Sequence, residues 1–174
     1  MMNCDSNLID DRALMIESVF TDGYKSKITT THGIYYSKMA VLHLLNNACI
    51  RYASTLEGRI QGTKQLMDFQ NKSPILIEPN KIAAFPTMSY KNIECVWIFN
   101  HRFHVEELGK GKSRVTFSNG MYSIVNASKS VLLKQQQRLH SLQNMYNIIH
   151  HEKKTYIGND PIVKSQSSSS DIKK

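Results

Sequence analysis

The sequence predicts an α+β domain with antiparallel strands, two central helices and a long C-terminal helix. Short segments rich in β-forming residues, separated by turn residues, occupy the chain before residue 38 and again over residues 75–126. Apolar side chains at helical spacing fill the region between them and the region that follows. Strands and helices grouped in blocks are typical of α+β folds. The 174 residues, 41% of them hydrophobic, suffice for one domain with its own core.

Nine short segments are expected to be strands. The first three should form an antiparallel meander, because Asp22-Gly23 and His32-Gly33 lie between them. Asn119-Gly120 predicts a type I′ hairpin turn, in which both residues have positive φ. The expected strands are residues 13–20, 25–31, 33–38, 75–77, 81–85, 95–100, 103–108, 113–118 and 121–126.

Two helices are expected in the middle of the chain. An apolar stripe at helical spacing begins after Met39 and continues to Tyr52. A second helix should start with Ser54 as its N-cap and Glu57 as the other half of a capping box, and should run to about Met67.

A third, longer helix is expected from Ser128 to about His151. The serine-rich residues 158–174 lack periodicity and contain few apolar side chains, so they are expected to form a disordered tail. The domain is therefore expected to span residues 1–157.

The charge of the chain is positive and unevenly distributed. The net charge is +8; residues 1–24 carry five acids and one base, and the remaining residues carry 21 bases and nine acids. A basic body behind an acidic leader is typical of proteins that bind polyanions, although simple solubility would explain it too. Three widely spaced cysteines form a poor disulfide framework, and no signal peptide or membrane span is evident, so we expect a cytoplasmic protein.

Several fragments resemble one family in their order and spacing. The most specific is PILIEPNKIAAFPTMS at residues 74–89. The others are Cys49-x-Arg51-Tyr52, Gly58-Arg59-x-x-Gly62-Thr63, Cys95-x-Trp97-Ile98, His104-Val105 and Val115-Thr116-Phe117-Ser118-Asn119-Gly120. From about Lys38 to Leu139 the chain is similar to the ComK competence transcription factors of low-GC Gram-positive bacteria.

The resemblance implies a bacterial transcription activator of competence, that is, of DNA-uptake genes. It implies binding to A/T-rich boxes of double-stranded DNA through the minor groove, as a dimer or tandem dimers. It implies no enzymatic activity and no cofactor. The partners would be DNA, further copies of the chain and RNA polymerase, and the protein would associate with the nucleoid when bound to DNA.

Two parts of the chain depart from the family. The segment between Arg51 and Gly58 is about one residue shorter than usual. The family's aromatic-apolar-Tyr-Pro docking motif, which the adaptor MecA uses for delivery to the protease ClpC, is missing from the C-terminal region. Degradation through this adaptor is therefore in doubt.

A minor-groove binder needs basic side chains that can enter a narrow, negative groove, and arginine enters at a lower cost than lysine. Arg59 is the leading candidate, because Gly58 and Gly62 beside it would permit close approach of the backbone to DNA. The alternative is that these glycines only allow tight helix packing. The expected DNA-binding residues are Arg51, Arg59, Lys64, Arg102, Lys110, Lys112 and Arg114.

Two of the basic regions have plain structural alternatives. The basic turn around Lys110 and Lys112 could contact phosphates without reading sequence, or could be an ordinary solvated loop. The bases of the last helix are expected on its solvated face rather than on DNA. These helix residues are Lys129, Lys134 and Arg138.

Three other interpretations are less favoured. The same basic surface could bind RNA or single-stranded nucleic acid, with exposed aromatic rings as stacking platforms. The four aromatic side chains concerned are instead expected in the core; they are Phe85, Trp97, Phe117 and Tyr122. A small metal-dependent hydrolase or nuclease could use His101, His104 and Glu106, and Cys95 with the two histidines could be part of a zinc site, but a fourth ligand is missing.

Overall fold

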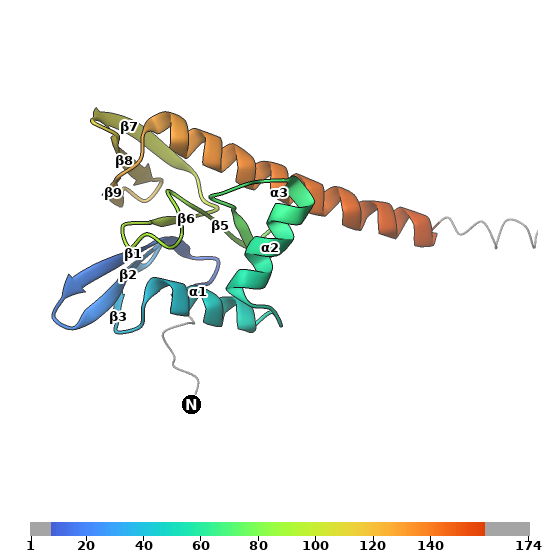
Figure 1. The fold of residues 1–174 in the computed structure, drawn as a ribbon, viewed down its shortest axis with the longest axis horizontal. Coiled ribbons are helices and arrows are strands. Elements are labelled where there is room, and N and C mark those ends of the chain that lie inside the picture. The colour runs from blue at the N-terminus through green and yellow to red at the C-terminus, as the bar shows by residue number, and fades with distance from the viewer. Residues whose placement is uncertain (1–7, 159–174) are drawn as a thin grey trace, which may run out of the picture.

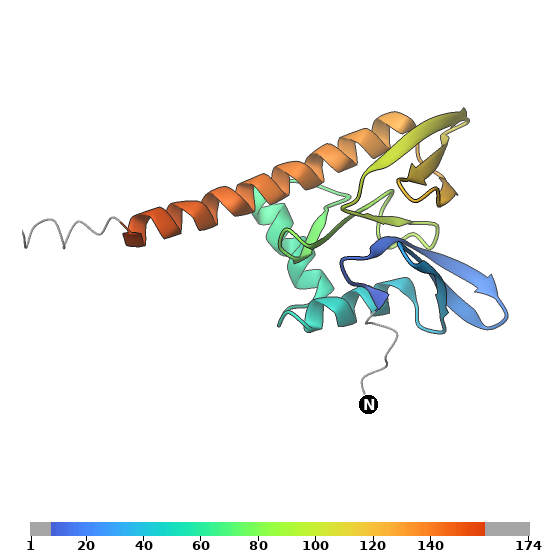
Figure 2. The same ribbon diagram turned by 180° about the vertical axis from the view of Figure 1, so that it is seen from behind.

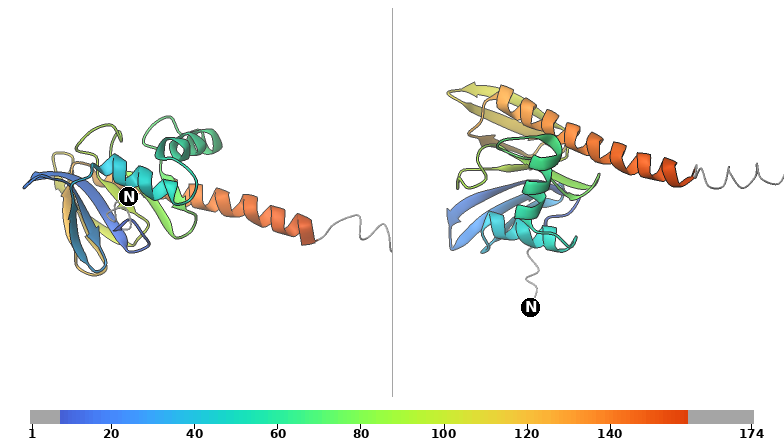
Figure 3. Two further views of the ribbon diagram at one scale, coloured as in Figure 1. Left: turned by 90° about the horizontal axis from the view of Figure 1, so that it is seen from below. Right: turned by 45° about the vertical axis from the view of Figure 1, so that its right-hand side comes forward.

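The computed structural model describes residues 8–158, and its side chains through residue 151. The domain has three layers, visible in Figure 1 and from another side in Figure 3. A six-stranded sheet forms the middle layer. Helices α1 and α2 cover one face, and a three-stranded sheet with helix α3 covers the other. The structure confirms the expected α+β fold with antiparallel strands, two central helices and a long C-terminal helix.

The six-stranded sheet is antiparallel throughout, with the strand order β3-β2-β1-β6-β5-β4. Its strands are β1 (Ala13–Thr21), β2 (Tyr24–Thr30), β3 (Gly33–Ser37), β4 (Ile75–Glu78), β5 (Ile82–Pro86) and β6 (Trp97–Phe99). The expected meander of the first three strands is confirmed. The acidic segment at the start of the chain therefore includes β1, an interior strand of this sheet, rather than forming a separate leader.

The three-stranded sheet is also antiparallel, with the order β7-β8-β9. Its strands are β7 (Phe103–Gly109), β8 (Lys112–Phe117) and β9 (Tyr122–Val125). The turn between β8 and β9 differs from the type I′ turn expected at Asn119-Gly120. Gly120 alone of the pair has positive φ, at +85°, and Phe117 bonds to both Gly120 and Met121. The loop is therefore one residue longer and ends in a glycine bulge.

The three helices are α1 (Val41–Ile50), α2 (Leu56–Met67) and α3 (Lys129–Gly158). Tyr52 was expected on the stripe of the first helix but follows it, and its hydroxyl donates to Glu78 at 2.7 Å. The N-cap of α2 is Thr55 rather than Ser54: the Thr55 hydroxyl accepts the Gly58 N–H at 3.0 Å. Serine and threonine are both good N-cap residues. Because the helix begins at Leu56, the residue directly before it, Thr55, is the N-cap.

Helix α3 is longer than expected. It continues past His151 to Gly158, so the two adjacent histidines do not end it. Its 30 residues make it about 45 Å long, and its second half extends beyond the body of the domain (Figures 1 and 2). The tail expected from residue 158 lies outside the described residues except for Gly158, which belongs to the helix. Within residues 8–158, no helix is both long enough and apolar enough to cross a membrane.

The part of the middle sheet formed by β6, β5, β4 and the first half of β1 is buried on both faces and separates two hydrophobic cores. Trp97 and Phe99 of β6 point into the core under α1 and α2, and Ile98 points into the core under the small sheet and α3. All three side chains are 2% exposed or less. The sequence correctly placed Phe85, Trp97 and Phe117 in the core.

Buried Gln135 fixes the first half of α3 to the middle layer. Its side-chain amide donates to the carbonyls of Lys72 at 2.8 Å and Pro86 at 2.9 Å. Nearby, Arg138 donates to the Asn71 carbonyl at 3.1 Å and lies over the Phe69 ring at 4.8 Å. Arg138 is therefore engaged with the body of the domain rather than pointing freely into solvent as expected.

The cap of α2 gives a direct stability test. Thr55→Ala removes the acceptor for the Gly58 N–H and should lower the free energy of unfolding by about 1 kcal/mol. Ser54→Ala should change it by no more than a few tenths, because Ser54 makes only a long 3.4 Å bond to the neighbouring carbonyl. Urea unfolding of both variants measures the difference. A larger loss of unfolding free energy for Ser54→Ala than for Thr55→Ala would mean that Ser54 is the N-cap.

Candidate nucleic-acid interface

The seven expected DNA-binding residues do not form one patch. One group lies around the α1–α2 corner, and another lies on the hairpin of β7 and β8, at the opposite end of the domain (Figure 1). Arg102 is exposed between β6 and β7. Arg51 and Arg59 lie at the corner, Lys64 lies in the last turn of α2, and the hairpin holds Lys110, Lys112 and Arg114.

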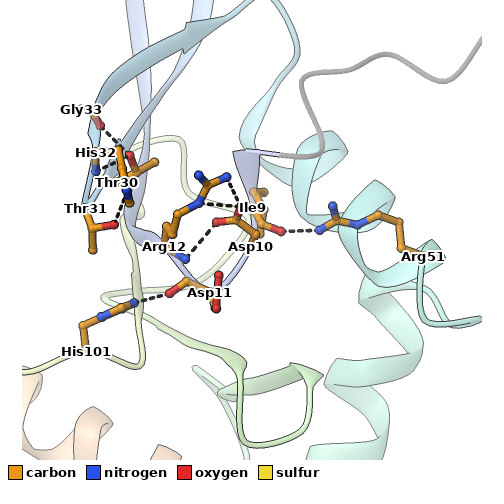
Figure 4. A network of polar contacts seen from close by, with 10 residues as sticks. All are labelled: Ile9, Asp10, Asp11, Arg12, Thr30, Thr31, His32, Gly33, Arg51 and His101. Atoms are coloured by element: carbon orange, nitrogen blue, oxygen red, sulfur yellow. Dashed lines mark hydrogen bonds and ion pairs between the residues drawn. The ribbon is translucent and has the colours of Figure 1, made fainter.

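Arg51 has a structural role. It follows α1, and its guanidinium donates to the carbonyl of Ile9 at the start of the described chain (Figure 4). Asp10 is close by: burial tends to raise its pKa, but hydrogen bonds from Arg12 and the charge of Arg51 outweigh this and hold the pKa below its usual value. The sequence could not show this role, because residues 9 and 51 come together only in the folded chain.

Arg59 lies on α2 beside a pocket of about 280 Å³. The pocket is lined by Ser54, Gly58, Arg59, Gly62, Thr63, Leu66, Leu76 and Leu142. The guanidinium makes one long bond, from Nη2 to the Tyr52 carbonyl at 3.4 Å, and its buried Nε has no hydrogen-bond partner among the described residues. The domain therefore holds the terminal N–H groups of Arg59 only weakly, and they can turn toward an acceptor outside it; a buried Nε without a partner in the described structure also occurs in Arg114.

The two glycines next to Arg59 differ in what they permit. A Cβ on Gly58 would lie 3.1 Å from the Thr55 hydroxyl, so the N-cap itself explains Gly58. A Cβ on Gly62 would meet no atom within 4 Å. Tight packing within the domain therefore does not explain Gly62. The helix surface beside Arg59 carries no side chain there and is open to solvent.

The hairpin between β7 and β8 ends in a tight turn with a basic tip. Lys110 and Gly111 both have positive φ, at +53° and +72°, which is the backbone of a type I′ turn. Lys110 and Lys112 are both exposed at this tip. A solvated cationic turn of this kind can contact phosphates, although nothing in its geometry selects a base.

Arg114 is already engaged on the outer face of the small sheet. Its Nη1 is 3.3 Å from the Glu106 carboxylate, and its guanidinium lies 5.4 Å from the Tyr122 ring centre. Tyr122 was expected in the core, but it is 61% exposed, because strand alternation places residues 122 and 124 on the solvent side. Arg114 is therefore less available for an external partner than Arg59.

The residues of the less favoured metal and hydrolase sites are not gathered into one cluster. His101 Nε2 lies 2.8 Å from the carbonyl oxygen of Asp11, a residue far from it in the sequence (Figure 4). Glu106 pairs with Arg114 instead. Cys95 is 3% exposed, and its thiol donates to the carbonyl of Met88. In the described part of the chain, no group of three histidine, cysteine or acidic residues is placed to hold a metal ion.

Comparisons with known proteins point to one family. The family model described as "ComK protein" matches residues 5–150. The chain is also 34% identical over 99 residues to the protein named "Competence transcription factor" of Bacillus subtilis (strain 168). That match covers 55% of this chain and 50% of the relative, so the chain spans about half the length of the curated relative it matches. No solved structure matches the chain.

Both described cysteines should be unreactive in the folded protein. Burial raises the pKa of the Cys49 thiol to about 11 and also raises that of Cys95, so at pH 8 almost no reactive thiolate is present. We expect iodoacetamide to modify neither residue at pH 8 in native buffer and both in urea, as located by peptide mass mapping. Rapid labelling of either cysteine in the native protein would show that the core opens there.

Proposed function

The chain belongs to the ComK protein family, and on this premise we propose that it is a DNA-binding transcription activator of competence genes. It would recognise A/T-rich duplex boxes through the minor groove, with no cofactor and no catalytic step. It would work as a dimer or as tandem dimers, in contact with RNA polymerase and associated with the nucleoid. The family match and the +12 body outside residues 1–24 support the proposal.

Arg59 is the observation that carries the proposed mode of recognition. Its side chain lines an open pocket, is held by a long 3.4 Å bond to the Tyr52 carbonyl, and lies beside Gly62, where the helix carries no side chain. In the minor groove the acceptors at the base edges are degenerate, and groove width selects A/T-rich sequence. A planar arginine on an unobstructed helix surface fits such a groove better than a lysine.

The other basic residues would strengthen binding without selecting sequence. Lys110 and Lys112 would contact phosphates at a distance from the groove that Arg59 enters, since the hairpin and α2 lie at opposite ends of the domain (Figure 1). Lys64 and Arg102 would contribute to the positive field around the chain. Arg51 would act indirectly by fixing the end of α1 to residue 9.

One observation favours a second candidate function, which is binding of RNA or single-stranded DNA. Tyr122 is 61% exposed on the outer face of the small sheet, next to Ile124 and under Arg114. An exposed ring beside an arginine is a stacking surface that any base can use. Preference for single strands over duplex, lost in Tyr122→Ala, would support this alternative.

Arg59→Ala should reduce selectivity, because it removes the one side chain expected to enter the groove. We expect a loss of about 1–3 kcal/mol on an A/T-rich duplex and a clearly smaller loss on a mixed-sequence duplex. Lys112→Ala should weaken binding to both duplexes by a similar amount, because it contacts phosphate only. Gel-shift titrations at fixed salt on both duplexes and on the matching single strand measure these effects.

Arg59→Lys is the matched control, since it keeps the charge and loses the planar head. It should retain binding to mixed-sequence DNA but not the preference for A/T-rich DNA. The melting temperature of each variant shows whether the fold is intact. If Arg59→Ala keeps wild-type selectivity, or if distamycin fails to compete with the wild type for the A/T-rich duplex, recognition does not occur through Arg59 in the minor groove.

Gly62→Ala separates stability from binding at the same surface. Alanine fits the open space at Gly62 and stabilises helices, so the free energy of unfolding should rise by about 1 kcal/mol. DNA affinity should fall several-fold, because the added methyl group keeps the duplex away from the helix. Gln65→Ala, on the same helix but outside the pocket, should leave DNA affinity unchanged. Unchanged affinity in Gly62→Ala would mean that DNA does not approach α2 there.

A further inference from the structure

The edges of the two sheets differ in how they are protected against pairing with another chain. Edge strands usually carry charges, prolines or bulges that block such pairing. Strand β4 lies between Pro74 and Pro79 and packs against α2. Strand β7 carries Glu106 and Glu107 and has a register shift before Gly109. Short strand β9 lies against the large sheet, where the Ser123 hydroxyl donates to Glu17 at 3.3 Å.

Strand β3 lacks these protections. Its sequence, Gly-Ile-Tyr-Tyr-Ser, contains no charge and no proline, and its pairing with β2 has no register shift. Ile34, Tyr35 and Tyr36 are 47%, 42% and 50% exposed. In the described part of the chain, no strand pairs with the outer side of β3. An uncharged, exposed and regular edge of this kind is a template for strand addition.

The register shows which backbone groups of β3 are open. After β2, the Thr31 N–H donates to Arg12 beside β1, so by strand alternation Thr30 and Ile28 direct their backbone groups toward β3. Their partners in β3 are Gly33 and Tyr35. Ile34 and Tyr36 therefore direct their N–H and C=O groups to the open side of the sheet.

We propose that β3 pairs with β3 of a second copy of this chain, antiparallel and centred on Tyr35, to form one continuous twelve-stranded sheet. In this register Ile34 lies opposite Tyr36 of the second copy, and the two residues exchange their open backbone hydrogen bonds. Tyr35 lies opposite Tyr35 of the second copy. The proposal gives a surface to the dimer of the proposed function, on which it rests only for its biological role.

The second copy fits this edge because the strand is complementary to itself. A two-fold axis through Tyr35 matches each open backbone group with its opposite, and it places the apolar Ile34 against an aromatic ring on the same face. Tyr36 also contacts Tyr24, with ring centres 5.6 Å apart, so its side chain is already held beside the edge. The nearby charges of Lys27 and Lys38 repel between copies, so added salt should not weaken the dimer.

The first experiment measures self-association of the full chain without DNA. In sedimentation equilibrium over a wide concentration series, the wild type should approach twice its 19.9 kDa monomer mass. Ile34→Lys places a charge on the edge and should raise the dimer dissociation constant about tenfold or more. Ile124→Lys is the matched control: it makes the same change at a 52% exposed position on β9 and should leave the dimer intact.

A second experiment tests the register and does not depend on how well Ile34→Lys folds. In a Cys4→Ser background, Tyr35→Cys should form a disulfide between copies on mild oxidation, because directly opposite residues of a non-hydrogen-bonded pair have Cα atoms about 4.5 Å apart. Ile34→Cys should not, because its own counterpart lies diagonally across the axis, at about 7–8 Å. The amides of Ile34 and Tyr36 should also gain protection from hydrogen exchange as the concentration rises.

Each of three results would overturn the proposal. The wild type could remain a monomer at every concentration. If the amides of Ile34 and Tyr36 are nevertheless protected from exchange in that monomer, another part of its own chain covers the edge. Ile34→Lys could dimerise as well as the wild type. Ile124→Lys alone could disrupt the dimer, which would place the interface on β9. DNA affinity is measured separately, and its steep loss with salt, opposite to the salt response of the dimer, distinguishes failure of this proposal from failure of DNA binding.

Discussion

The burial of the centre of the six-stranded sheet on both faces is the constraint on which the rest of the domain depends. Strand β6 is only three residues long, yet it contributes Trp97 and Phe99 to one core and Ile98 to the other. Each such side chain stabilises the fold by about 1.5–3 kcal/mol through burial. A substitution in this strand would therefore disturb the packing of the helices on one face and of the small sheet on the other, so the layers fold as one unit.

The polar contacts at the edges of this sandwich explain why several basic residues are not free to bind DNA. Arg51 fixes the start of the described chain, Arg138 fixes the segment after α2, and Arg114 is held between Glu106 and Tyr122. Arg59 is held more weakly, by a long 3.4 Å bond to the Tyr52 carbonyl, and it lines an open pocket. Net charge alone could not separate structural from available arginines.

Much of the fold could be predicted from the sequence because local periodicity reports local structure. All nine strands and three helices were expected near their observed positions. The wrong predictions concern features that depend on tertiary contacts, which sequence periodicity does not report. The exposed face of β9 is set by which sheet packs beneath Tyr122, and the cap of α2 is set by the point at which Leu56 enters the core. The pairing of Arg114 with Glu106 requires the register of β7 and β8, and so does the open edge at Ile34 and Tyr36.

The turn between β7 and β8 places Lys110 in an unfavourable backbone conformation, and this affects which substitutions are favoured there. Lys110 adopts a left-handed backbone conformation, which costs a residue with a Cβ about 1–2 kcal/mol and which asparagine, aspartate or glycine would tolerate better. Mutation toward those residues should therefore be favoured by folding alone. A lysine that persists at this position among related chains would be evidence of selection for its charge, whereas a lysine on an ordinary exposed strand carries no such information.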